Sequence, residues 1–208
     1  YFKSDWRYRF DRADTRDHPF TRADGSQRTV PMMHREGELR LNATPEVSVA
    51  ELAYGREAYA MTIVLPHPET DLDGLIETLD AEQWDAWTEG LQERSMQIAL
   101  PRFRLEYETT MNEPLVRLGM ASAFKRVPGT DFTAMSPVGQ NLFISNVVQK
   151  TFIDVNEEGT EAAAATSVGI AVDSAPPAII VDRPFIVAIR ERLSGTIVFL
   201  GVIGDPGA

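Results

Sequence analysis

Residues 156–177 read NEEGTEAAAATSVGIAVDSAPP, and this stretch does most to decide the fold. Local propensity favours a helix over its first half, with Thr160 as N-cap, four alanines as the body and Gly169 as the stop. The same residues also have the period of a strand. Alternate positions from Thr160 to Val172 form a face of small or β-branched side chains without charge, and both charged residues lie on the other face. The segment therefore suits two states, an exposed loop or helix and a buried central strand.

Strands dominate the rest of the chain. Hydrophobic alternation and β-branched runs predict strands at residues 29–33, 37–41, 46–54, 58–65, 97–107, 142–155, 179–189 and 196–203. A helical period predicts two helices between residues 72 and 91, with Asp80 and Gln83 as a capping box between them. A third helix is predicted over residues 111–124, capped by Asn112 or Thr110. Because the helices are clustered and do not alternate with the strands, the pattern indicates an α+β fold.

The composition excludes several classes of protein. The 208 residues carry 31 acidic and 20 basic side chains, a net charge of −11 that disfavours an electrostatic nucleic-acid binder. There is no cysteine, so disulfides, thiolate metal sites and a cysteine nucleophile are excluded. No apolar run approaches the roughly 18 residues of a membrane span.

The sequence offers no catalytic constellation. Its three histidines, His18, His34 and His67, stand beside turn residues or charges, in no metal-binding pattern. No Gly-x-Ser-x-Gly elbow, phosphate loop or His-Glu-x-x-His helix occurs. We therefore expect no enzyme activity, no cofactor and no metal site.

Several motifs together resemble the serpin family over the whole chain. Residues 156–166 resemble the mobile hinge of inhibitory serpins, and residues 179–189, IIVDRPFIVAI, resemble the family's C-terminal signature. Further landmarks are YFKSDW at 1–6, LPRF at 100–103, LGM at 118–120 and NLFIS at 141–145. The resemblance implies the α+β serpin fold, with a large, mostly antiparallel sheet, second and third sheets, a few helices and a mobile reactive loop at about residues 157–178.

The first residues give no sign of a natural start. Tyr1-Phe2-Lys3 is strand-like, with no initiator Met and no signal peptide. Against the serpin pattern, residues 1–208 correspond to the C-terminal part of a single domain, of prokaryotic type. We therefore expect the N-terminal part of that domain to be missing, and a piece of this kind would expose unpaired strand edges.

The resemblance assigns roles to named residues. The hinge comprises Glu157, Glu158, Gly159, Thr160, Glu161, Ala162, Ala163, Ala164, Ala165 and Thr166. Trp6, Arg102 and Glu157 correspond to the region where the loop enters the large sheet, which we call the breach, and Glu157 is expected to pair with Arg102. Gln149 stands where the family has a histidine of the shutter, a hydrogen-bond cluster that controls sheet opening. A glutamine both donates and accepts, so we expect substitution within that network.

The resemblance also implies an inhibitor that acts as a pseudo-substrate. A serine protease, or as an alternative a cysteine protease, would cleave the loop, remain attached as an acyl-enzyme and be trapped as the loop inserts into the sheet. Counting fifteen residues from Gly159 places the cleaved bond at Asp173-Ser174, which calls for a protease specific for Asp or Glu. A register one residue earlier would put Val172 at the site and suit a protease that cleaves after small apolar residues.

The expected partner is the target protease alone, with the inhibitor a monomer that binds no nucleic acid and no membrane. We expect an extracellular or periplasmic location, with the cytoplasm as an open alternative. Two other functions remain open: a non-inhibitory carrier or chaperone of the same fold, and a hydrolase whose chemistry lies in the missing half. A further alternative is that residues 1–208 are inactive without the missing half.

Overall fold

The computed structural model describes residues 2–125, 131–160 and 177–207. Contacts divide the chain into two compact units, one of Tyr1–Arg104 with Ile153–Ala208 and one of Leu105–Phe152. The reactive loop predicted at about 157–178 lies mostly outside the described residues, as does the turn predicted at 127–129.

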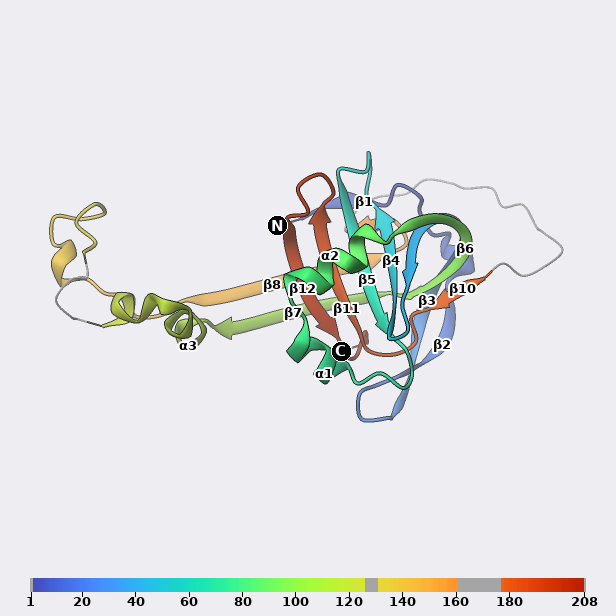
Figure 1. Ribbon diagram of the computed structural model, residues 1–208, viewed down its shortest axis with the longest axis horizontal. Helices are drawn as coiled ribbons and strands as arrows, with labels where there is room; N and C mark the ends of the chain where they lie inside the picture. The colour runs from blue at the N-terminus through green and yellow to red at the C-terminus, as the bar shows by residue number, and fades with distance from the viewer. Residues whose placement is uncertain (1, 126–130, 161–176, 208) are drawn as a thin grey trace. The chain divides into compact units, whose positions relative to one another are not determined.

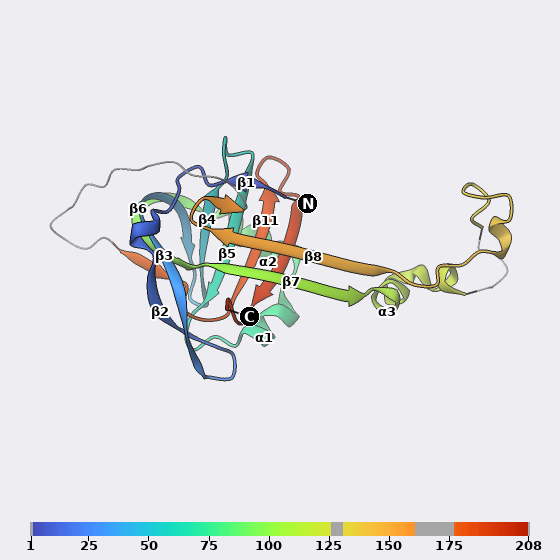
Figure 2. The ribbon, with the colours of Figure 1, turned by 180° about the vertical axis from the view of Figure 1, so that it is seen from behind.

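The first unit is built on an eight-stranded sheet. Its strands are β2 (Arg16–Thr21), β3 (Gln27–Ala43), β4 (Val47–Ala53), β5 (Tyr59–Pro66), β6 (Gln92–Pro101), β10 (Ala178–Ile180), β11 (Phe185–Glu191) and β12 (Ile197–Ile203). Seven of the strands follow the order β10-β6-β3-β4-β5-β11-β12. The eighth strand, β2, pairs with β3 and lies next to it in the view from behind (Figure 2). The pairing of β10 with β6 is parallel, and the other recorded pairings in this sheet are antiparallel.

Two helices cover one face of this sheet (Figure 1). They are α1 (Leu72–Thr78) and α2 (Ala81–Glu89), and the carboxylate of Asp80 caps α2 by accepting the Gln83 amide at 2.8 Å. Trp84 and Trp87 of α2 pack with buried sheet residues into one hydrophobic core, whose other members are Val47, Val49, Val64, Leu91, Ile186 and Ala188. Full burial of a large apolar side chain contributes about 1.5–3 kcal/mol, so this core anchors the helix pair. The prediction of two helices with Asp80 as the cap of the second is confirmed, and Asp71 caps the first.

The longest strand differs from the prediction. The sequence suggested two short strands, 29–33 and 37–41, whereas β3 is continuous over 17 residues from Gln27 to Ala43. Pro31 pairs with Asp17 of β2, and Gly37 keeps its place opposite Met96 of β6 with a φ of 142°. Local breakers are overridden because three partner strands, β2, β4 and β6, fix β3 along its length.

The single strand predicted at 179–189 is divided into two strands in the structure. β10 ends at Ile180 and β11 begins at Phe185. Between them, the Arg183 guanidinium binds the Pro66 carbonyl at 2.8 Å and the Asp182 carboxylate at 2.7 Å. The five apolar residues that begin β11, residues 185–189, are all buried, as their unbroken run indicates, and the charged Arg190 after them is buried as well.

A second sheet has the order β1-β9-β8-β7. Its strands are β1 (Ser4–Asp5), β7 (Phe103–Thr110), β8 (Val148–Asn156) and β9 (Gly159–Thr160), with a short 3₁₀ helix η1 (Arg12–Asp14) after β1. The strand predicted at 97–107 is therefore divided between β6 of the first sheet and β7 of the second, with Arg102 between them.

The unit Leu105–Phe152 contains a broken helix. The helix predicted over 111–124 is α3 (Asn112–Leu115), a π-helical turn η2 (Val116–Met120) and a 3₁₀ turn η3 (Ala121–Phe124); a further turn, η4, spans Gly139–Asn141. The break falls at Gly119, whose φ is 98°. The predicted cap by the side chain of Asn112 or Thr110 is wrong, because Met111 is the N-cap and no side chain makes a capping hydrogen bond there.

Asn112 has another role in this unit. Its side-chain amide donates to the Ser145 carbonyl at 3.1 Å and accepts from the Val147 amide at 2.8 Å. The Ile144 amide is likewise bound, by the Ala123 carbonyl at 2.8 Å. These hydrogen bonds occupy backbone groups of residues 142–147 that would otherwise pair with a neighbouring strand. The strand predicted at 142–155 therefore begins only at Val148.

Candidate functional site

The start of the predicted hinge forms a strand. β8 turns back on itself after Asn156, so that Asn156 pairs with Gly159 and Val155 with Thr160. On its other side β9 pairs with β1, Gly159 with Asp5 and Thr160 with Ser4. Gly159 and Thr160 therefore lie as a short central strand between two antiparallel neighbours.

The close approach of β1 explains the glycine at 159. Its φ is 146°, a conformation that side-chain-bearing residues rarely adopt. A Cβ atom there would lie 2.4 Å from the Ser4 carbonyl oxygen and 2.6 Å from the Asp5 Cα. Both are backbone atoms, so no side-chain movement could relieve the overlap.

Thr160 turns its side chain into the interior. It is 4% exposed, and its hydroxyl lies 2.9 Å from the hydroxyl of Tyr54, which is 2% exposed. Burial raises the pKa of Tyr54, because the phenolate would have to form away from water. The strand period predicted an inward face that includes Thr160; the rest of that face lies outside the described residues.

Trp6 joins the hinge to Tyr54. Its indole ring is buried and stacks on the Tyr54 ring at 4.5 Å between centroids and 10° between planes. The indole nitrogen donates to the Asn156 carbonyl at 2.8 Å, and the Trp6 amide donates to the Glu158 carbonyl at 2.9 Å. A single residue thus holds both ends of the turn between β8 and β9.

Two carboxylates fix the turn itself. The Glu157 side chain is 3% exposed and accepts a hydrogen bond from the Thr15 hydroxyl at 2.7 Å. Arg102, the partner that the resemblance implies, has its Nε 3.7 Å from the other carboxylate oxygen and is half exposed. Glu158 pairs with Arg12 at 2.9 Å. The three residues predicted for the breach, Trp6, Arg102 and Glu157, therefore gather around the turn.

The sequence did not reveal Tyr54, Thr15 and Arg12 as parts of this site. They lie 106 to 146 positions from their partners in the chain, and none belongs to a motif with a recognisable spacing. Their contribution depends on the packing of β1 and the following segment against the turn.

Other predicted site residues lie elsewhere. Gln149 is exposed on β8, and within the described residues no hydrogen bond of its side chain is recorded, so its role in a shutter network stays a prediction. Residues 161–166 of the hinge and the bond Asp173-Ser174 lie outside the described part of the chain.

The described residues bring no three acidic or histidine side chains together as a metal site. His34 and His67, for example, bond to backbone carbonyls through Nδ1. None of the helices in the described ranges is long and apolar enough to cross a membrane.

Comparison with known proteins gives consistent matches. The family model described as serpin (serine protease inhibitor) matches residues 1–206. Antithrombin-III of Mus musculus is 35% identical over 214 residues, which are 99% of this chain and 45% of that protein. Serpin B8 of Homo sapiens is 38% identical over 212 residues, 99% of this chain and 56% of that protein.

Solved structures agree. Native protease nexin-1 with heparin is similar with a TM-score of 0.83 at 31% identity, covering 99% of this chain and 54% of that one. The thermophilic serpin tengpin in its native state has a TM-score of 0.84 at 30% identity, covering 98% and 53%. The chain spans about half the length of these relatives. The predicted α+β serpin fold is confirmed, and with a family match over nearly every residue the chain belongs to the serpin family.

Proposed function

We propose that the protein carrying this chain inhibits a serine protease by offering residues 157–178 as a pseudo-substrate loop. After cleavage the loop enters the sheet between β1 and β8, and the acyl-linked protease is trapped. The observation that carries the proposal is the hinge: Gly159 and Thr160 already lie as a strand between those two neighbours. Relatives named as inhibitors, such as plasminogen activator inhibitor 1 of Neovison vison at 34% identity, support the inhibitory class.

The alternation of side chains provides the physical reason for insertion. Thr160 is buried on one face of β9, so the residues two and four positions later, Ala162 and Ala164, take the same face if the strand continues. These side chains are small and uncharged and would enter with little steric or desolvation cost. On the same condition, Glu161 would take the opposite face and stay away from that interior.

The chemistry of trapping belongs to the protease. Its serine attacks the carbonyl of the cleaved bond, the new amine leaves, and an ester joins the serine to the loop. Movement of the ester with the inserting loop displaces it from the groups that would hydrolyse it. Because a misplacement of about 1 Å can cost roughly a hundredfold in rate, insertion over many residues would stop deacylation.

Thr160→Arg tests the mechanism. A guanidinium forced into the Thr160 position would be buried without a partner, which costs several kcal/mol. We therefore expect it to expel β9 from between β1 and β8, so that insertion has no strand to extend and the variant is cleaved as a substrate without retaining the protease. Glu161→Arg is the matched control, since the alternation of a strand would turn the same side chain to the other face one residue later. The assay is denaturing electrophoresis after incubation with a panel of serine proteases. A protease complex that survives denaturation as well in Thr160→Arg as in the parent would overturn the proposal.

The cleavage position is tested separately. We propose Asp173-Ser174, with Val172 as the residue before the cut if the register is one earlier. Incubation with an Asp/Glu-specific protease and with an elastase-like protease, followed by mass spectrometry of the released C-terminal peptide, identifies the bond. A peptide that begins at neither Ser174 nor Asp173 would contradict both registers.

A carrier function without inhibition is the second candidate, and it makes a different prediction. Loop cleavage followed by insertion adds a strand and should raise the melting temperature markedly, whereas a carrier with no inserting loop should show little change. The location we propose is extracellular or periplasmic, where a target protease would be met, with the cytoplasm open.

A further inference from the structure

A cavity of about 310 Å³ lies beside Trp6 in the first unit. Arginines and glutamates from β3, β4, the segment after β1 and the turn after β11 line it. It is large enough for a small organic ion, at the lower end of the range of ligand pockets. Its lining holds four arginines and four glutamates, so the partners of each arginine decide what the cavity could bind.

Most of the arginines here already have partners. Glu51, whose side chain is 1% exposed, is 2.8 Å from Arg40 and 3.2 Å from Arg192, and it also binds the buried Arg190 behind the wall. Glu57 is 2.6 Å from Arg7 and 3.0 Å from Arg192. Three arginines of the lining, together with Arg190, thus share the carboxylates of Glu51 and Glu57, and the fourth lining arginine pairs with neither.

Arg35 has no such partner. Within the described ranges no carboxylate lies within 4.0 Å of its guanidinium, and its Nε is buried without a hydrogen bond. Its one recorded bond is a long one, 3.4 Å from Nη2 to the Glu38 carbonyl. The other arginine with a buried, unbonded Nε, Arg22, differs because the Asp205 carboxylate lies 2.8 Å from that atom.

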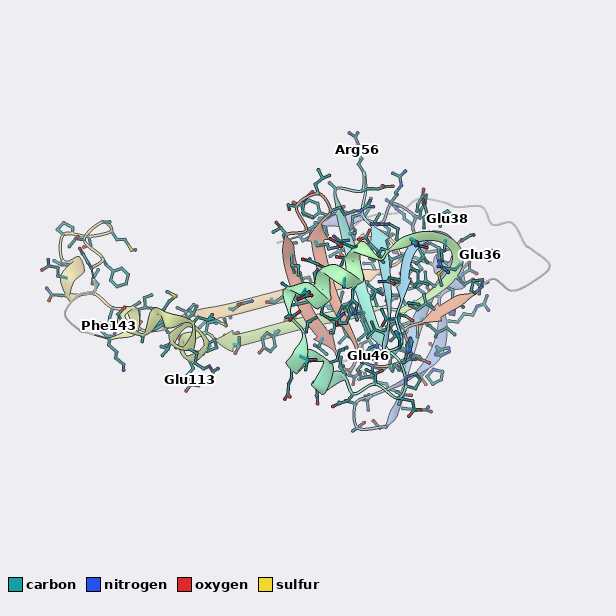
Figure 3. All side chains as sticks on the ribbon, in the orientation of Figure 1. Glu36, Glu38, Glu46, Arg56, Glu113 and Phe143 are labelled. Carbon is teal, nitrogen blue, oxygen red and sulfur yellow. The ribbon has the colours of Figure 1, made fainter. Side chains whose placement is uncertain are left out.

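Aromatic rings hold Arg35 in place. Its guanidinium carbon lies 5.5 Å from the centre of the Tyr8 ring and 5.9 Å from that of the Phe10 ring, within range of cation–π attraction. The remaining acidic residues of the lining, Glu38 and Glu93, are exposed to solvent; Glu38 lies at the outside of the sheet (Figure 3). Desolvation lowers the pKa of Arg35, as expected for a cation removed from water without a counter-ion.

We propose that this cavity binds a small oxyanion, a phosphate or a carboxylate, with Arg35 as its principal ligand. A planar guanidinium donates two parallel hydrogen bonds to either group, and an anion would supply the charge that Arg35 lacks. The Tyr8 ring, which lines the cavity beside Arg35, favours an anion that carries a flat apolar part, such as an aromatic carboxylate. Nothing in this proposal depends on protease inhibition.

The test uses the melting temperature and the binding isotherm of the protein that carries this chain. Inorganic phosphate and benzoate are titrated at a constant ionic strength of about 0.15 M, with chloride as the balancing anion. We expect a saturable rise of the melting temperature with one or both probes; the probe that binds more tightly distinguishes a phosphate ligand from an aromatic carboxylate. If neither probe shifts the melting temperature relative to chloride, the proposal is wrong.

Arg35→Met separates binding from folding. Methionine keeps the apolar stem against the rings and removes the uncompensated charge, so the ligand-free variant should melt at or above the parent temperature. Its affinity for the probes should fall at least about tenfold, the loss expected for a charged hydrogen bond. Arg94→Met is the control, because Arg94 is exposed on β6 and does not line the cavity. A parent-like affinity in Arg35→Met, or an equal loss in Arg94→Met, would overturn the assignment.

Discussion

The pair of buried hydroxyls at Tyr54 and Thr160 gives a quantitative test of how the hinge is held. We consider Thr160→Val, which keeps the shape of the side chain and removes its hydroxyl. The Tyr54 hydroxyl would then be buried with its one recorded partner gone. A buried polar group left without a bond costs about 1–3 kcal/mol, which corresponds to roughly a five- to 150-fold change in an equilibrium constant.

The cost should appear as opening of the turn between β8 and β9. The Trp6 amide donates to the Glu158 carbonyl at 2.9 Å, so its hydrogen exchange reports whether that turn is closed. We expect exchange at Trp6 to accelerate by the factor above in Thr160→Val, and by a similar factor in Tyr54→Phe, which strands the Thr160 hydroxyl instead. Amides of β11, in the core of the other sheet, are the internal control and should not change.

The double variant decides between a hydrogen bond and simple packing. Tyr54→Phe with Thr160→Val removes both hydroxyls and leaves no unpaired group, so we expect its exchange to return close to that of the parent. If the two single effects add in the double variant, or if each is below about twofold, the two hydroxyls are not coupled and the reasoning fails.

Two further predictions concern charge. Glu51→Gln should lower the free energy of unfolding by about 3–5 kcal/mol in urea titrations, because it leaves the buried Arg190 without its carboxylate. Glu57→Gln, at a side chain that is 42% exposed, should cost no more than about 1 kcal/mol. Equal effects would show that burial of Glu51 does not matter. Because burial raises the pKa of Tyr54 above the unfolded value near 10, its contribution to stability is complete below about pH 10 and is lost as the pH rises further, by ~1.4 kcal/mol per pH unit. Urea titrations at pH 9 and pH 11 should therefore show a smaller loss in Tyr54→Phe than in the parent, and equal losses would contradict the assignment.

The local signals in the sequence predicted elements well where the residues of the element itself determine its conformation and burial. Asp80 caps α2, and the apolar run of β11 is buried on both faces. They failed where a distant partner determines the backbone. Pro31 and Gly37 would interrupt an isolated strand, but β6 pairs with ten consecutive residues of β3 and keeps it extended. In residues 142–147 the opposite happened, since Asn112 takes the backbone bonds that a strand would need.

The candidate site shows the same division. The resemblance brought out Trp6, Arg102 and Glu157, and the structure gathers all three at one turn. Tyr54 and Thr15 were out of reach because a hydroxyl contact between distant positions leaves no spacing in the sequence. Gly159 was predicted for its backbone freedom, and the structure adds a stricter reason, the lack of room for a Cβ beside Ser4.

These contacts define where loop insertion would begin. Gly159 is fixed by the absence of space and Thr160 by a buried hydrogen bond. Glu157 pairs with Arg102, between β6 and β7, and Glu158 pairs with Arg12, in the segment that follows β1. Starting a new central strand is the costly step, because the chain must be ordered before its ladder bonds compensate for the lost entropy. Here that first step is already complete, so each later pair of residues extends an existing strand. On this argument the balance between an exposed and an inserted loop is set by the residues after Thr160, whose inward side chains must fit, and only secondarily by the turn that precedes it.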